Sequence, residues 1–409
     1  MPGMRQSIRI AVAILLLAAV PFPAGASPVE SYQSAATCSK CHPEIHRAWT
    51  GSQHASAFTD PAFRIPYDRL LQANPGRTLD CERCHNPMRF LLPPDDPRAA
   101  AFSREGVTCD FCHSVEAVIP GEAFPRYRTT PGIKFGPRGK GDAESQHVRR
   151  FSPLHLTSDF CAGCHEYRNA HGTPILTTVS EWKESFYSGT GVHCQFCHLP
   201  ELFDARFIEG KRRNGPPDHG MVGGHSRERL ARSIPVHARL RVSSDGAQVS
   251  VSLKNDLVGH ATPSGIPTHR IRLSATLFDG AGNALATREE TFGKVMGDGT
   301  GKPLTRPEEI FLSAREVLKD NRIRPKETRE VTFSFPAGGA APATASVSVT
   351  YEMATPDIAP SLHYIEIPVA NRVVIAEATW APGKAFVFLA AAILALLVFL
   401  VVRKKRAGG

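Results

Sequence analysis

The sequence predicts an α+β multidomain chain. It has a mostly helical and looped region over residues 27–232, a β-sandwich over 233–377 and a C-terminal transmembrane helix over 385–402. Three observations support this prediction. Five copies of one cysteine and histidine motif fall in the first region. The second region has no cysteine, and its apolar residues alternate with polar ones. The third segment is an unbroken apolar stretch.

The first 26 residues have the layout of a secretory signal peptide. Arg5 and Arg9 precede the apolar run Ile10–Val20, and Ala24-Gly25-Ala26 supplies small residues for cleavage. An uncleaved anchor is the alternative, but this apolar run is too short to span a bilayer. We therefore expect an exported protein whose mature chain begins near Ser27.

The apolar stretch Ala385–Val402 would form a helix of about 27 Å, which is enough to cross a bilayer core. The linker 378–384 leads into it, and the basic run Arg403–Arg406 opens the tail 403–409. Positive charge marks the cytoplasmic side. We therefore expect a single-pass anchor that holds the rest of the chain in the periplasm, at the outer face of the membrane. A C-terminal sorting tail that is cleaved off is the alternative.

All ten cysteines belong to five copies of the pattern Cys-x-x-Cys-His. This pattern attaches c-type haem: two thiols add to the vinyl groups, and the histidine becomes the proximal iron ligand. A disulfide framework or zinc sites would not explain a histidine after every second cysteine. The sequence therefore predicts five covalently bound c-type haems. The attaching thiols are Cys38, Cys41, Cys81, Cys84, Cys109, Cys112, Cys161, Cys164, Cys194 and Cys197, and the proximal ligands are His42, His85, His113, His165 and His198.

The formal charge of +9 does not indicate a nucleic-acid partner. Two arginines of the leader and four basic residues of the tail account for six of these charges, which leaves +3 for the exported part. Haem propionates would balance many of the remaining Arg and Lys residues. We expect no nucleic acid among the partners.

The five motifs share residues 27–232, which is too little polypeptide to wall five haems apart. We therefore expect the haems to form much of the core, with their edges close enough for a continuous electron path. Proline, glycine and short polar segments are frequent in this region. Short helices are predicted at 43–50, 61–72 and 179–186.

The alternation in the second region predicts a hairpin, with Leu240 and Val242 on one strand and Val249 and Val251 on the next. Short strands with turn signals between them favour an immunoglobulin-like β-sandwich. We expect this sandwich to cover part of the haem surface. Further strands are predicted at 271–278, 331–335, 346–351 and 373–376.

The chain has 17 histidines, which leaves more than five for distal iron ligands once the proximal ones are assigned. Imidazole is the commonest metal ligand, and axial ligation is a main control on haem potential. His147 and His155 precede the fourth motif at spacings seen for distal ligands, and the choice between them stays open. We take His46, His237, His269 and His363 as ordinary residues.

Residues 38–58 resemble the opening of the multihaem cytochrome superfamily that contains the tetrahaem cytochrome c of nitrifying bacteria and hydroxylamine oxidoreductase. The resemblance extends over most of residues 31–230 and implies that His54 is a distal ligand. Other similar segments are Glu105–Cys109, Ser158–Cys161, Glu181–Trp182 and Gly191–Pro200.

Two further loops resemble ligand loops of such cytochromes. The segment Asp218–His225 is similar to the histidine-rich loop after the family's last motif, which implies a ligand role for His219 and makes His225 a further candidate. The segment Gly259–Gly265 is similar to a loop that follows the haem region, which implies that His260 reaches back to a haem. The aromatic residue usual there is replaced by Thr262.

Two functions follow from the number of distal ligands. If every iron has two ligands from the protein, the chain is an electron-transfer relay between redox partner proteins or a membrane quinol-oxidising complex and an acceptor. If one iron has an open position, the chain is an oxidoreductase for a small nitrogen or sulfur compound. All five motifs end in His, so the lysine-containing motif of pentahaem nitrite reductases is absent. We favour the relay.

Overall fold

The computed structural model describes residues 32–121, 125–138, 147–203, 214–354, 358, 364–367 and 373–375. For 201–203, 214–216, 364–367 and 373–375 it describes the backbone alone. The predicted leader 1–26, linker 378–384, transmembrane helix 385–402 and tail 403–409 lie outside the described residues, as does His363. None of the helices within the described ranges is long and apolar enough to cross a membrane.

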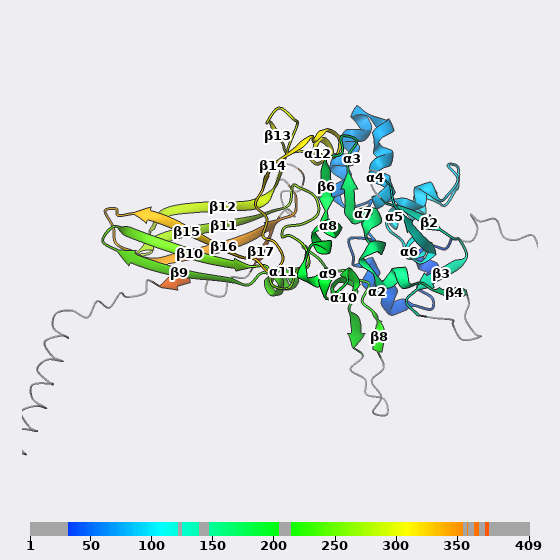
Figure 1. Ribbon diagram of the computed structural model, residues 1–409, viewed down its shortest axis with the longest axis horizontal. Coiled ribbons are helices and arrows are strands. Elements are labelled where there is room, and N and C mark those ends of the chain that lie inside the picture. Colours follow the sequence, from blue (N-terminus) through cyan, green and yellow to red (C-terminus); the bar gives the residue numbers. More distant parts are fainter. Residues whose placement is uncertain are drawn as a thin grey trace, which may run out of the picture.

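Two parts lie side by side in Figure 1: a motif region of short helices and small hairpins, and a sandwich of long strands that extends away from it. The motif region comprises residues 32–233. Its helices are α1 (Ala35–Cys38), α2 (Pro43–Thr50), α3 (Pro61–Ala73), α4 (Thr78–His85), α5 (Ala99–Arg104), α6 (Cys109–Ser114), α7 (Ala162–His165), α8 (Thr178–Lys183), α9 (Phe186–Gly189), α10 (Cys194–His198) and α11 (Arg227–Ser233), with 3-10 turns at Pro75–Arg77, Pro87–Phe90, Pro153–Leu156 and Ser158–Phe160.

Short strands in the motif region form four two-stranded pairs. The β3–β4 pair is parallel, and the other three are antiparallel. These strands are β1 (Val115–Ile119), β2 (Arg126–Thr129), β3 (Ile133–Gly136), β4 (Val148–Phe151), β5 (Glu166–Arg168), β6 (Pro174–Thr177), β7 (Glu201–Phe203) and β8 (Asn214–Pro217).

Local capping explains where several short helices begin. The Asp60 carboxylate accepts a hydrogen bond from the Ala62 N–H (2.8 Å), and Pro61 occupies the first turn of α3. Thr108 caps α6 in the same way. Two motifs coincide with short helices: α6 begins at the third motif, and α10 consists of the fifth. In such a turn, residues three and four apart share a face, so both thiols and the histidine point to the same side.

The sandwich consists of a three-stranded sheet in the order β15-β10-β9 and a seven-stranded sheet in the order β13-β12-β11-β16-β17, with β14 on β12 and β18 on β16. All of its paired strands are antiparallel. Its elements are β9 (Val236–Ser243), β10 (Gly246–Lys254), β11 (Arg270–Asp279), β12 (Ala284–Gly297), β13 (Pro303–Leu304), α12 (Pro307–Ser313), β14 (Glu316–Asp320), β15 (Thr328–Pro336), β16 (Pro342–Glu352), β17 (Tyr364–Ile367) and β18 (Val373–Ile375).

The main hydrophobic core lies between these two sheets. Alternate residues of β9, β10, β11 and β16 are buried there, including Leu240, Val251, Leu273 and Val347. Among the described residues, the motif region has a smaller apolar cluster built around Met88 and Phe111, and it shares another with the sandwich through Ile175. Met88 is therefore a packing residue of the cluster that contains Phe111. The contrast indicates that something other than its own side chains fills the interior of the motif region.

The end of the sandwich nearest the motif region is built by β13, β14 and α12, and α12 packs beside α3 (Figure 1). Asn169 Nδ2 donates to the Ala314 carbonyl (2.7 Å) across this junction. Lys294 Nζ donates to the Pro174 carbonyl (2.7 Å). The two parts are thus joined by specific buried hydrogen bonds.

Candidate functional site

A connected cavity of about 3080 Å³ runs through the motif region and extends to the sandwich. The ten cysteines and five histidines of the Cys-x-x-Cys-His motifs all line it. The six candidate distal histidines, His54, His147, His155, His219, His225 and His260, line it as well. Residues that are dispersed over more than 200 positions of the sequence therefore face one space.

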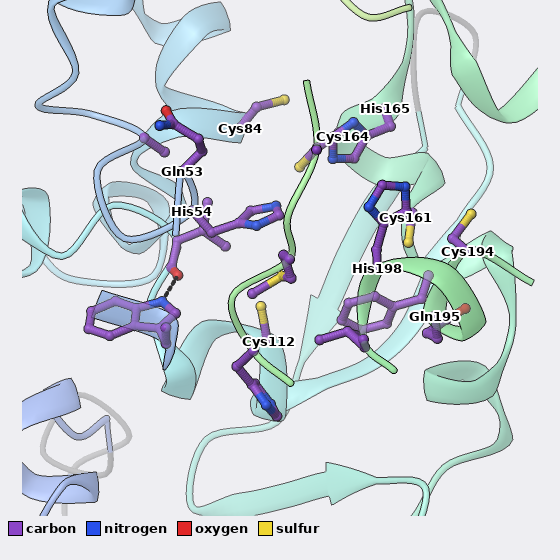
Figure 2. Close-up of a pocket in the computed structure, with 18 of the residues that line it drawn as sticks. Gln53, His54, Cys84, Cys112, Cys161, Cys164, His165, Cys194, Gln195 and His198 are labelled. Atoms are coloured by element: carbon purple, nitrogen blue, oxygen red, sulfur yellow. Dashed lines mark hydrogen bonds between the residues drawn. The ribbon is translucent and has the colours of Figure 1, made fainter. Parts of the chain in front are cut away.

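Thiols of different motifs come together within this cavity. The Cys38 thiol interacts with that of Cys109, and the Cys161 thiol interacts with that of Cys194. A third interaction joins Cys84 to Cys164. Figure 2 shows the part of the cavity where Cys84, Cys112, Cys161 and Cys164 gather around His54 and His165. Residues of all five motifs therefore line one connected space.

Three motif histidines are oriented by backbone carbonyl groups. Nδ1 of His85 lies 2.7 Å from the Ala57 oxygen, Nδ1 of His113 lies 2.7 Å from the Phe135 oxygen, and Nδ1 of His198 lies 3.1 Å from the Val222 oxygen. A carbonyl oxygen only accepts, so Nδ1 carries the proton and Nε2 is left to bind a metal. This second hydrogen bond is the usual companion of metal-ligating imidazole.

Four motif histidines each face a second histidine. Imidazole nitrogens bind transition metals at about 2 Å, so two rings on opposite sides of one metal ion have their centres roughly 6 Å apart. The observed spacings agree with this arrangement. They are 6.4 Å for His42 and His147, 6.2 Å for His165 and His54, 6.3 Å for His113 and His219, and 6.5 Å for His198 and His260.

A second candidate, His155, also lies near His113, with ring centres 6.0 Å apart. The His155 Nε2 lies 3.2 Å from the Cys112 carbonyl, and its Nδ1 is buried without a hydrogen-bond partner among the described residues. His219 instead uses Nδ1 on the Pro217 carbonyl (2.8 Å), which leaves Nε2 free. The hydrogen-bond pattern of His219 is that of a metal ligand, and the pattern of His155 is not.

His85 is the exception among the motif histidines. Its ring stacks on Phe63, with centres 3.8 Å apart and planes 12° from parallel. Among the described residues, no histidine ring faces it at the spacing of the other four pairs. The second motif therefore differs from the others in what surrounds its histidine.

Burial keeps four of the cavity histidines in their neutral form. It lowers the pKa of His54 to about 3, with further lowering by the nearby His165 and His198. It lowers the pKa of His85, His113 and His198 to about 4. Neutral imidazole is the form that binds metals, so these side chains are ready to act as ligands at pH 7.

His225 and His269 line the cavity without facing a motif histidine. His269, taken as an ordinary residue from the sequence, lies in this cavity wall. Its Nδ1 donates to the Ser264 carbonyl (2.8 Å), and burial lowers its pKa to about 4. Its place in the same loop as His260 is the signal that could have indicated this position.

The residues present fit covalently bound haem. Each motif supplies two thiols and a histidine to the cavity, and four of the five motif histidines have a partner ring at the spacing of a shared iron. The cavity also takes the place of a hydrophobic core, as expected where porphyrin fills the interior.

Comparison with known proteins agrees with this fit. The profile of the family described as "Cytochrome c554 and c-prime" matches residues 37–114, which hold the first three motifs. The solved structure of a penta-heme cytochrome c552 from Thermochromatium tepidum is similar to the chain, with a TM-score of 0.64 and 24% sequence identity, over 83% of this chain and 98% of that chain. The chain has the fold of a multihaem c-type cytochrome.

Other comparisons add nothing to this multihaem cytochrome fold. The IrmA protein from Escherichia coli matches 34% of this chain and 87% of its own, with 11% identity and a TM-score of 0.15. A CARDB domain from Pyrococcus furiosus matches 35% of this chain and 83% of its own, with 13% identity and a TM-score of 0.16. Scores this low carry no structural argument. No curated protein matches the sequence significantly. The motif profile and the fold support covalent c-type haem and a role in electron transfer.

Proposed function

We propose that the protein is an exported, membrane-anchored pentahaem cytochrome that relays electrons through five haems held in one cavity. Haem iron supplies reversible one-electron exchange at each position. The observation that carries the proposal is the set of four facing histidine pairs within the single space that all five motifs share. An iron whose two axial positions are both occupied by protein ligands has no position for a substrate, and this favours electron transfer.

The proposed ligand sets follow from ring spacing and hydrogen bonding. The pairs are His42 with His147, His113 with His219, His165 with His54, and His198 with His260. His155 and His225 are assigned to the cavity wall. His85 is the proximal ligand of the fifth haem, and the described residues supply it with no histidine partner.

Contacts between motif thiols indicate which haems would be neighbours in the proposed electron path. The first motif meets the third through Cys38 and Cys109. The third lies near the fourth, because Cys164 contributes to raising the pKa of Cys112. The fourth meets the fifth and the second through the further thiol contacts described above. This arrangement is a chain from the first to the fifth motif, with the second motif as a branch at the fourth.

The relay is tested by spectroelectrochemical titration and electron paramagnetic resonance of the purified full-length protein. We expect five haems per chain, with four that are low-spin in both redox states. Fewer than four low-spin haems would reject the ligand pairs. Electron transfer is then measured by the rate at which a reduced periplasmic donor or quinol analogue reduces the protein.

The location and the partners rest on the sequence alone. The signal-like leader and the apolar C-terminal stretch support a periplasmic protein held at the outer face of the cytoplasmic membrane. We propose redox proteins or a membrane quinol-oxidising complex as partners. Membership of the superfamily that includes hydroxylamine oxidoreductase is proposed on the motif resemblance. Fractionation of expressing cells, with and without a high-salt wash, tests the anchoring.

A second function is favoured by the surroundings of His85. No histidine ring among the described residues faces it at the spacing of the other four pairs, so these residues supply no second histidine ligand for this iron position. Such a site could admit a small nitrogen or sulfur compound. The protein would then be an oxidoreductase in which the other four haems carry electrons to or from the second motif.

Carbon monoxide separates the two functions. Binding to one haem per reduced chain, together with turnover of hydroxylamine, nitrite or sulfite, supports the oxidoreductase. Binding without turnover supports a relay that has one open iron. Lack of any CO binding rejects the oxidoreductase and indicates that a residue outside the described ranges completes the ligand set.

A further inference from the structure

His260 reaches the motif region from a loop of the sandwich, the segment 255–269 between β10 and β11. Asn255 anchors the first part of this loop: its Nδ2 donates to the His260 carbonyl (3.0 Å) and to the Ile323 carbonyl (2.9 Å). Thr262 and Ile323 exchange two backbone hydrogen bonds of 2.9 Å. These contacts fix the loop to the sandwich. They do not fix it to the motif region, where the partner ring His198 lies.

The charged contact between this loop and the motif region is made by the carboxylate of Glu181 on α8. The Tyr187 hydroxyl on α9 also donates to the Asp256 carbonyl of the loop. The Glu181 Oε2 accepts hydrogen bonds from the Ala261 N–H (3.1 Å) and the Ser264 hydroxyl (3.3 Å), both on the loop. Its Oε1 accepts one from the Thr177 hydroxyl (2.6 Å) on its own side of the junction. The residue next to His260 is therefore held by a charged acceptor that belongs to the motif region.

A buried arginine of the sandwich completes this arrangement. Arg322 Nη1 lies 2.7 Å from Glu181 Oε1, and its Nε and Nη2 form a bidentate pair with Asp320 at 2.8 and 2.7 Å. The Arg322 side chain is only 8% exposed. A buried charge pair is strongly destabilised when one partner is removed, because the other charge is left uncompensated. The pair thus fixes the orientation of the Glu181 carboxylate.

Close packing leaves little freedom for the rest of the loop. An added Cβ at Gly259 would lie 3.2 Å from the Trp182 ring, and Trp182 follows Glu181 on α8. The Thr178 and Ser264 hydroxyl groups lie 2.9 Å apart. The backbone on both sides of His260 therefore rests on α8.

We propose that Glu181 is a positioning residue: it holds the sandwich loop so that His260 faces His198, and thereby sets the ligation and the potential of the haem on the fifth motif. This inference rests on the proposed His198–His260 ligand pair. It adds that the sandwich controls the redox properties of one haem through a hydrogen-bonded carboxylate at the junction.

Replacing Glu181 by Gln tests the role of the charge. The amide keeps the size of the side chain, but one of its two ends becomes a donor. That end must then face either Ala261 N–H and Ser264, or Thr177 and Arg322, all of which donate to the carboxylate. The substitution also leaves Asp320 as the remaining carboxylate paired with Arg322 among the described residues. We expect the His260 loop to loosen in the E181Q variant.

The measurements are the CO-binding stoichiometry of the reduced full-length protein and the midpoint potentials from spectroelectrochemistry. E181Q should show a CO-reactive fraction above that of the wild type and a changed potential of one low-spin haem. Glu184→Gln is the matched control, because Glu184 is exposed at the end of the same helix and carries the same charge. E184Q should behave as the wild type.

His260→Ala separates the failure of this inference from the failure of the ligand assignment. H260A should gain one CO-binding haem per chain. If H260A gains none, the His198–His260 pair is wrong, and the proposed function must be revised. If H260A gains one while E181Q matches the wild type in CO binding and potentials, the positioning role of Glu181 is overturned.

A milder variant keeps the test decisive if E181Q does not accumulate as folded protein. Ser264→Ala removes the loop hydroxyl that contacts the same carboxylate and Thr178, and it leaves the Glu181–Arg322 pair intact. S264A should raise the CO-reactive fraction above that of E184Q, by less than H260A does. A fraction equal to that of E184Q overturns the proposal.

Discussion

The rings of His198 and His260 stand 6.5 Å apart and 12° from parallel, although one belongs to the fifth motif and the other to a loop of the sandwich. The ligand set of at least one proposed haem therefore spans the junction between the two parts. If the proposed pair binds iron, the docking of the sandwich determines whether that iron position is closed.

The two histidines near His113 give the first prediction. We expect His219→Ala to convert one haem from low-spin to high-spin, because His219 has its Nδ1 on a backbone carbonyl and its Nε2 free. His155→Ala should leave all low-spin signals in place, because its Nε2 is engaged by the Cys112 carbonyl. Electron paramagnetic resonance of the oxidised variants measures the difference.

These two variants control for each other, because both remove an imidazole whose ring centre lies within 6.3 Å of His113. The reverse result, with a high-spin haem in H155A and none in H219A, would assign His155 as the ligand. His219 would then be a wall residue that shapes the cavity.

The sandwich core gives the second prediction. Leu273 is fully buried between the two sheets. Leu273→Ala should lower the free energy of unfolding by about 2–5 kcal/mol, because the substitution removes apolar contacts and leaves a cavity. Leu285→Ala is the control, since Leu285 is 37% exposed on β12, and it should change the unfolding free energy by less than about 1 kcal/mol. Urea denaturation followed by circular dichroism measures both, and equal effects would contradict the two-sheet core.

Strands and helices could be predicted from the sequence where the periodic burial of their apolar side chains alone determines the element. Strands predicted at 271–278, 331–335 and 346–351 lie within β11, β15 and β16, because alternate side chains enter one core. The helix predicted at 43–50 coincides with α2. The helix predicted at 179–186 divides at Ser185, whose hydroxyl caps the next helix, α9. Capping by a single serine changes a boundary that periodicity does not reveal.

Other features could not be read because they depend on distant contacts. The long strand β12 carries charged residues over its exposed half and shows no clean alternation. The five motif histidines were identified from their pattern, since covalent attachment fixes local spacing. The pairing of His42 with His147 depends on how segments over 100 residues apart meet, and the exception of His85 depends on the stacking of α3 on α4 through Phe63. The choice between His155 and His219 required hydrogen bonds that no spacing shows.

Lys294 gives the third prediction, which concerns pH. Its ammonium group is buried at the junction and donates to the Pro174 carbonyl, and burial, with the nearby Arg322 charge, lowers its pKa from 10.5 to about 8. Between these two values the unfolded chain binds a proton that the folded chain has lost. Stability therefore rises with pH across this window. The penalty for charging Lys294 is fully present below pH 8 and amounts to roughly 3 kcal/mol.

The measurement compares urea midpoints of the wild type and Lys294→Met at pH 7 and pH 10, because other titrations cancel in the difference. The stability of the wild type relative to K294M should increase between the two pH values. Lys319→Met, on the exposed face of the neighbouring β14, is the control, and its difference from the wild type should stay constant. A constant difference for K294M would show that Lys294 stays charged in the folded protein.

The fourth prediction concerns Gly106, which holds the His54 segment against the third motif. Its φ is +56°, and an added Cβ would lie 2.6 Å from the His54 carbonyl oxygen and 3.0 Å from the Ala57 nitrogen. The same His54 oxygen accepts a hydrogen bond from the Val107 N–H (2.9 Å). Gly106→Ala must therefore push the His54 backbone away, in addition to the roughly 1–2 kcal/mol that a left-handed conformation costs a residue with a side chain.

Gly172→Ala separates these two effects, because Gly172 has a φ of +75° but no atom within 4 Å of an added Cβ. Both variants should lose stability from backbone strain, but only G106A should also lose the low-spin signal of the haem placed between His54 and His165. Thermal unfolding and electron paramagnetic resonance measure the two effects. If G106A keeps every low-spin haem, His54 remains an iron ligand although its backbone is displaced. The close packing at Gly106 would then contribute to stability alone.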